Sequence, residues 1–92
     1  MVKDILRTEL KIILMKILHR AEGFDRGSNK YFINFLNYSY SSASEVESLL
    51  YVALDQDYIT DKEFEFNYLL AEKIKKLIGG FIKYLKNSPI SN

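Results

Sequence analysis

Apolar residues recur every three or four positions along most of this chain, and no other feature restricts the fold as strongly. The first set is Leu6, Leu10, Ile13, Ile17 and Ala21. Because an α-helix turns once in about 3.6 residues, such a set lies on one face and predicts a helix over residues 2–22. Gly23 and the polar residues 25–28 then predict a turn.

The same spacing continues over residues 28–56, where Ser28 is a suitable N-cap for a second helix. The predicted buried face of this helix is one stripe, in which either Phe35 or Leu36 takes one position. Its other members are Phe32, Ser39, Ala43, Val46, Leu50 and Ala53.

A third helix is predicted over residues 61–86. Thr60 and Glu63 have the spacing of a capping box, and Pro89 prevents the helix from continuing. Gly79 and Gly80 lie inside this helix, where each costs about 1 kcal/mol relative to alanine, so we expect either close approach of another helix or a local kink there. The predicted buried stripe is Leu70, Ile74, Leu77, Phe81 and Leu85.

Three long helices joined by short turns predict an all-α, antiparallel up-and-down bundle that forms a single domain over residues 1–92. The first helix has a wider apolar arc than one neighbouring pair requires. Either it is the central helix of the bundle, or part of the arc contacts another molecule. The additional apolar residues are Ile5, Ile12, Leu14, Met15 and Leu18.

The composition favours a folded cytoplasmic protein. Apolar residues make up 48% of the chain and charged residues 27%, and cysteine is absent, so disulfides cannot contribute to stability. Lys16 interrupts the longest apolar run, which predicts no membrane contact. Asp4, Arg7 and Glu9 interrupt the start of the chain, which predicts no secretion signal.

Catalytic and metal-binding patterns are missing from the sequence. With one histidine and no cysteine, the chain lacks the residues for a nucleophilic triad or a carboxylate–histidine metal site. No glycine-rich phosphate loop occurs either. We therefore expect no enzymatic activity, cofactor, metal or small-molecule substrate.

Charge is unevenly distributed along the sequence. Residues 1–30 contain seven basic and four acidic side chains, residues 31–65 contain one and seven, and residues 66–92 contain five and one. The basic side chains of the first and third helices either form a nucleic-acid surface or are a solvated face that complements the acidic second helix. Tyrosines of the second helix would stack bases, anchor an interface or fill the flank of the bundle. These rings are Tyr31, Tyr38, Tyr40 and Tyr51.

From Ala21 onward the sequence resembles the four-helix-bundle family of 23S rRNA-intervening sequence proteins. The likeness covers about three quarters of the chain and continues through the third helix at Phe64, Ile74, Leu77, Gly80 and Leu85. The residues that carry its first part are Ala21-Glu22-Gly23-Phe24, Arg26, Ser28, Phe32-Ile33, Phe35-Leu36, Ser42-Ala43, Glu45, Glu47, Ala53-Leu54-Asp55 and Tyr58-Ile59.

This resemblance implies a non-enzymatic protein that forms homo-oligomeric rings, commonly pentamers, and that binds RNA or DNA. Relative to the family pattern, we expect this chain to lack the first helix. The alternatives are a protein–protein interaction module without nucleic-acid affinity, or a truncated member that has lost its function. The resemblance and the charge distribution together predict these nucleic-acid contacts: Arg7, Lys11, Lys16, Arg20 and Arg26.

Overall fold

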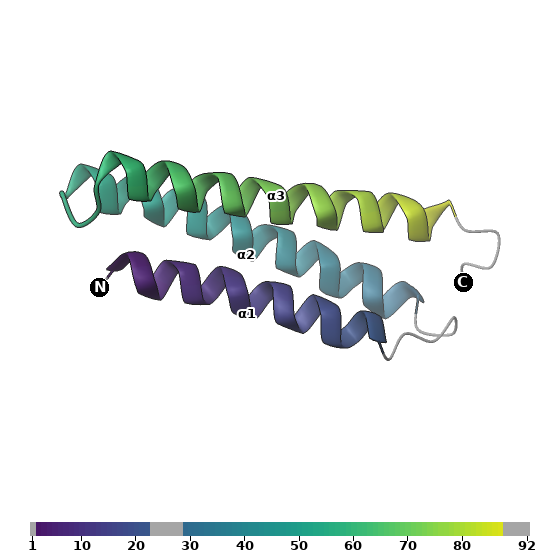
Figure 1. Ribbon diagram of the computed structural model, residues 1–92. Helices are drawn as coiled ribbons and strands as arrows, with labels where there is room; N and C mark the ends of the chain where they lie inside the picture. Colours follow the sequence, from purple (N-terminus) through teal and green to yellow (C-terminus); the bar gives the residue numbers. More distant parts are fainter. Residues whose placement is uncertain (1, 23–28, 88–92) are drawn as a thin grey trace.

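The computed structural model describes residues 2–22 and 29–87 of the protein. Three helices account for most of them: α1 (Val2–Glu22), α2 (Asn29–Asp55) and α3 (Asp61–Lys86). They lie side by side in a rod of 48 × 19 × 15 Å, in which α1 and α3 run in one direction and α2 in the other (Figure 1). No strand occurs in these two ranges. The predicted all-α, up-and-down bundle is confirmed.

The core lies between the three helices and uses one narrow face of each. On α1 the predicted face is confirmed for Leu6, Leu10, Ile13 and Ile17, which are buried, whereas Ala21 is half-buried. On α2 the buried position that the sequence assigned to either Phe35 or Leu36 is taken by Leu36, which is fully buried. Phe35 is half-buried beside it. The remaining predicted members of the α2 stripe are all buried.

The predicted buried face of α3 is correct only in part. Ile74 and Leu85 are buried, but Leu77 is 47% exposed, and Leu70 and Phe81 are half-buried. The buried face of α3 is therefore rotated about the helix axis relative to the predicted one. The prediction considered only large apolar residues, and it missed Asn67 and Ala71 because one is polar and the other small. The buried residues of α3 are Asn67, Ala71, Ile74, Ile78 and Leu85.

A tight turn joins α2 to α3. Asp57 has a positive φ of 59°, the left-handed conformation that commonly ends a helix. The backbone N–H of Tyr58 donates to the carbonyl of Ala53 at 2.8 Å, which completes a Schellman motif. The predicted capping box follows: Glu63 N–H donates to Thr60 Oγ1 at 3.1 Å, and Thr60 N–H donates to Glu63 Oε1 at 2.9 Å.

Gly79 and Gly80 do not approach another helix of this chain. Both are exposed, and a methyl group added at either Cα would meet no atom within 4 Å. The prediction of close packing inside the bundle is therefore wrong. Their conformational cost is not offset by any contact among residues 2–22 and 29–87.

Some sequence predictions fall outside the described residues. These are the helix-ending role of Gly23, the polar turn over 25–28 with the N-cap role of Ser28, and the stop at Pro89. Within the described ranges, none of the helices is long and apolar enough to cross a membrane.

The burial pattern of α2 predicts the cost of removing its side chains. Leu36→Ala and Leu50→Ala should each lower the free energy of unfolding by about 2–5 kcal/mol, because both side chains are fully buried. Phe35→Ala should cost less, since its ring is half-buried. Urea unfolding of the three variants measures this order. A Leu36 variant as stable as the parent would contradict the assigned face.

Candidate functional site

The structure separates the predicted basic set onto two flanks of α1. Arg7 faces α3, where its Nε lies 3.4 Å from Asn67 Oδ1 and its guanidinium lies 5.0 Å from the centre of the Phe66 ring. Arg20 faces α2, with its guanidinium 4.9 Å from the centre of the Phe35 ring. These two arginines therefore do not share a surface.

The exposed lysines of α1 are divided in the same way. Lys11 and Lys16 are five positions apart, which is about 140° around a helix. Lys16 contributes to hollows between α1 and α2, on the same flank as Arg20. Arg26 lies outside the described residues. The structure thus splits the predicted set into two pairs: Arg7 and Lys11, which are one helical turn apart, and Lys16 and Arg20, which line one hollow.

Two adjoining hollows lie along the α1–α2 flank and share Lys16 and Phe35. The larger, of about 540 Å³, is lined by Met15, Lys16, His19, Arg20 and Phe35. The smaller, of about 130 Å³, continues past Tyr38 and the serines of α2. Ser39 is buried there and donates its hydroxyl to the carbonyl of Phe35 at 3.0 Å. Lys16 and Arg20 thus border the aromatic ring of Phe35 in the larger hollow, whereas Glu9 adds an acidic side chain to the smaller one.

The four tyrosines of α2 have different surroundings. Tyr51 packs against Phe64 and Tyr68 of α3, with ring centres 4.9 and 5.7 Å away. Tyr40 lies under the Lys75 ammonium, 5.0 Å from its ring centre. Tyr31 and Tyr38 are 67% and 73% exposed. These two rings are the most exposed of the four, since Tyr51 is 52% and Tyr40 41% exposed.

Acidic and basic side chains are separated along the length of the rod. Counting charges over residues 1–30, 31–65 and 66–92 of the sequence does not reveal this separation. The half that contains the α2–α3 turn comprises residues 2–11 and 43–72, with four basic and ten acidic side chains, a formal net charge of −6. The other half comprises residues 12–22, 29–42 and 73–87, with eight basic and one acidic side chain, a net charge of +7. The larger hollow lies in this basic half.

Helix dipoles explain only part of this separation. Acidic residues near the start and basic residues near the end are favourable in α1 and α3, and both helices have them. In α2, however, no acidic residue lies in the first turn and no basic residue in the last. Lys30 near the start of α2 and Asp55 at its end interact unfavourably with the dipole of that helix. Both residues nevertheless match the charge of the half of the rod in which they lie. The polarity is therefore a property of the bundle as a whole.

Comparison with known proteins identifies the family. The family model described as 23S rRNA-intervening sequence protein matches residues 17–80, from the end of α1 into α3. This chain belongs to the 23S rRNA-intervening sequence protein family. The comparisons with curated proteins and with solved structures gave no match. The resemblance drawn from the sequence is thus confirmed at the level of the family.

This family member also contains an ion-pair cluster between α2 and α3 that the sequence analysis did not find. Glu47 is buried, and its Oε1 accepts a hydrogen bond from Lys75 Nζ at 2.8 Å. Burial raises the pKa of the Glu47 carboxyl, whereas Glu47 raises the pKa of Lys75 and keeps that ammonium charged. A charged lysine is not a nucleophile. In the described ranges, no group of three or more His, Asp or Glu side chains could hold a metal ion.

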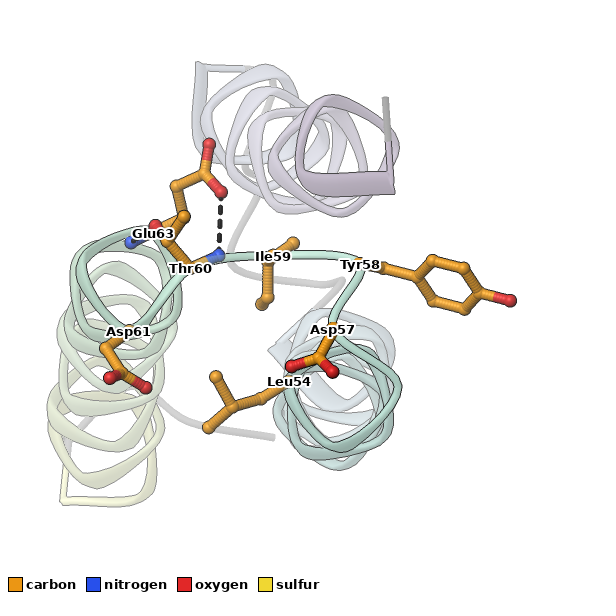
Figure 2. Close-up of a pocket in the computed structure, with 7 residues that line it drawn as sticks. All are labelled: Leu54, Asp57, Tyr58, Ile59, Thr60, Asp61 and Glu63. Atoms are coloured by element: carbon orange, nitrogen blue, oxygen red, sulfur yellow. Dashed lines mark hydrogen bonds between the residues drawn. The ribbon is translucent and has the colours of Figure 1, made fainter.

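A further hollow of about 410 Å³ lies at the α2–α3 turn and includes Asp57 and Asp61 (Figure 2). The polar groups of Thr60 and Glu63 are already engaged in the capping box, as Figure 2 shows for Thr60 N and Glu63. Lys3 of α1 adds an ion pair, with 2.6 Å between its Nζ and Glu63 Oε2. We call these contacts the junction: the capping box connects the turn to α3, and the Lys3–Glu63 ion pair connects α1 to the same place.

The junction predicts an acid-sensitive contribution to stability. Lys3 and the Thr60 amide lower the pKa of Glu63 from its ordinary value of 4.5 to about 2. Because the unfolded chain binds this proton more readily, stability should fall as the pH drops from about 4.5 to about 2. Glu63→Gln keeps an oxygen for the Thr60 amide but removes the charge, so its unfolding midpoint should depend less on pH in this window.

Glu45→Gln is the matched control, because Glu45 is exposed and makes no ion pair within the described part of the chain. Thermal unfolding between pH 2 and 7 measures both variants. If the unfolding midpoint of Glu63→Gln falls with decreasing pH as steeply as that of the parent, the Lys3–Glu63 junction contributes nothing to the acid sensitivity of folding.

Proposed function

We propose that this family member is a non-enzymatic, cytoplasmic RNA-binding protein that associates with copies of itself. The RNA assignment is supported by one observation above all: the larger α1–α2 hollow lies in the basic half, beside the helix that exposes Tyr31 and Tyr38. Lysine and arginine attract phosphates, and unstacked bases stack on aromatic rings. The family description names an intervening sequence of 23S rRNA, which favours RNA over DNA.

Single-stranded RNA suits this surface better than a duplex. Stacking on Tyr31 or Tyr38 requires bases that are not already paired, which loops and single strands provide. Lys16 and Arg20 flank the same hollow, where they would contact the phosphates between stacked bases. Phosphate contacts and stacking carry little sequence information, so we expect affinity with weak sequence preference.

Charge reversal within the hollow tests this proposal. Lys16→Glu/Arg20→Glu should weaken binding of a fluorescent single-stranded RNA about tenfold or more at low salt. It should also reduce the slope of log affinity against log salt by about 1–2, because two phosphate contacts are lost. Fluorescence anisotropy across a salt series measures both quantities, and circular dichroism checks that the helices are retained.

Lys11→Glu/Lys62→Glu is the control with a similar charge change, since both lysines are exposed and belong to the acidic half. It should leave most of the affinity intact. Equal losses in the two double variants would argue for an unlocalised charge effect. If the parent binds no RNA at low salt, the RNA assignment fails, and a protein-interaction module becomes the better hypothesis.

Self-association is supported by the outer face of α1. Ile5, Met15 and Leu18 are 62%, 67% and 54% exposed, and Ile12 is 38% exposed. The wide apolar arc is therefore not covered by α2 or α3. Several exposed large apolar side chains on one helix are typical of protein–protein contacts. The pentamer implied by the family resemblance stays a prediction. The mass of the assembly in solution gives the number of copies and tests it.

Polar substitution on this face should reduce the association. Ile5→Gln/Leu18→Gln, at two side chains that do not line the α1–α2 hollows, should shift the mass measured by light scattering toward that of the monomer at a concentration where the parent is oligomeric. Leu49→Gln/Val52→Gln is the matched control, because it removes two exposed apolar side chains from α2. A parent that stays monomeric at about 50 µM, where even modest interfaces are populated, would refute self-association.

A further inference from the structure

The outward face of α3 carries four charged side chains in an ordered row. Glu65 and Lys83 are eighteen positions apart, which is about five full helical turns, so they point in the same direction. Glu72 and Lys76 lie between them within about 40° of that direction. All four are exposed. The row thus reads acidic, acidic, basic, basic from the start of α3 to its end.

This row is complementary to itself only in the antiparallel direction. Glu65 and Lys83 are equally distant from residue 74, and so are Glu72 and Lys76. A two-fold axis near residue 74 would therefore set each glutamate against a lysine of a second copy. Parallel copies would instead place glutamate beside glutamate and lysine beside lysine. Since Glu72 already lies 3.5 Å from Lys75 of its own chain, the outer pair, Glu65 and Lys83, is the more informative one.

The apolar and small residues of this face obey the same symmetry. Leu69 is 53% exposed and lies among the charges of the row. Leu69 lies five residues before residue 74 in the sequence, and Gly79 lies five residues after it. Gly79 and Gly80 leave open space above the helix, because nothing lies within 4 Å of a Cβ placed at either position. An antiparallel copy would seat its Leu69 over this gap, and the contact would account for two exposed glycines that this chain alone does not explain.

The charge of the whole rod favours the same orientation. Its halves carry −6 and +7 over a length of 48 Å. Antiparallel neighbours bring opposite halves together along the full length, whereas parallel neighbours bring like halves together.

We propose that two copies of this chain pair through the outward faces of α3, antiparallel about a two-fold axis near residue 74, with Glu65 against Lys83 and Leu69 over the gap at Gly79 and Gly80 of the second copy. This pairing rests on the proposed self-association and not on RNA binding. It uses α3, whereas the RNA surface lies between α1 and α2. Loss of one therefore leaves the other measurable.

Single cysteines test the orientation, because the chain has none of its own. When Glu65→Cys and Lys83→Cys proteins are mixed and treated with a short thiol crosslinker, the mixed 65–83 product should dominate. Each variant alone should give little product. The other Glu65 and Lys83 of such a pair remain in place to hold the contact. Crosslinks within each variant alone, without a mixed product, would establish parallel copies and overturn the proposal.

Light scattering on the same samples separates the two levels of failure. An oligomeric sample without the mixed crosslink refutes the α3 pairing and leaves self-association standing. A monomeric sample refutes both, while RNA anisotropy still tests the RNA surface independently.

Charge exchange provides a second test that does not depend on a crosslinker. Glu65→Lys and Lys83→Glu should each weaken pairing about tenfold at low salt, because each creates two like-charge contacts in a symmetric pair. The double variant Glu65→Lys/Lys83→Glu restores opposite charges in the antiparallel arrangement and should recover the parental dissociation constant. A double variant as weak as either single variant would overturn the proposed register.

Substitution at the glycine gap distinguishes pairing from folding. Gly79→Gln should leave thermal stability equal or higher, because glutamine is a better helix former and its Cβ meets no atom of the chain. It should nevertheless weaken pairing, since the gap is filled. Ser41→Gln, at an exposed position of α2, is the control. Pairing unaffected by Gly79→Gln would remove Leu69 and the glycines from the contact.

Discussion

Packing of one narrow apolar face from each helix is the constraint on which the rest of this structure depends. The chain has no cysteine, and the hydrogen bonds within each helix are local, so contacts among these faces must hold the three helices together. α2 and α3 are additionally linked by the buried Glu47–Lys75 pair, and α1 is fixed to the start of α3 by Lys3 and Glu63. The exposed side chains of the described residues outside these faces are available for contacts with other molecules.

The sequence predicted the elements of the fold well because the relevant signals are local. The apolar spacing and the Thr60–Glu63 capping box place the helix ends within one residue of their observed positions. The face of α3 was harder to predict, because buried Asn67 takes the place of an apolar residue. Its amide donates to the carbonyl of Glu63 at 2.8 Å and its oxygen faces Arg7, which satisfies it in the core. That compensation depends on α1 and cannot be read from α3 alone.

The candidate site was predicted less well, for a geometric reason. Grouping charges by sequence made α1 and α3 basic and α2 acidic. In the folded rod the helices alternate in direction, so the acidic end of α2 lies beside the acidic starts of α1 and α3 (Figure 1). Of the predicted set, Lys16 and Arg20 line one hollow, next to the exposed Tyr31 and Tyr38, whereas Arg7 and Lys11 lie on another flank of α1. Helix direction, and not residue type, was the missing information.

The proposed surfaces together limit how copies could be arranged. A two-fold contact between α3 helices joins copies in pairs, whereas a five-membered ring has an odd number of copies. Both can hold only if two rings meet through their α3 faces. Antiparallel pairing would also place the two basic halves at opposite ends of the pair, each beside an acidic half of the other copy. One RNA strand reaching both α1–α2 surfaces would therefore have to pass an acidic region between them, which favours separate RNA segments at the two ends.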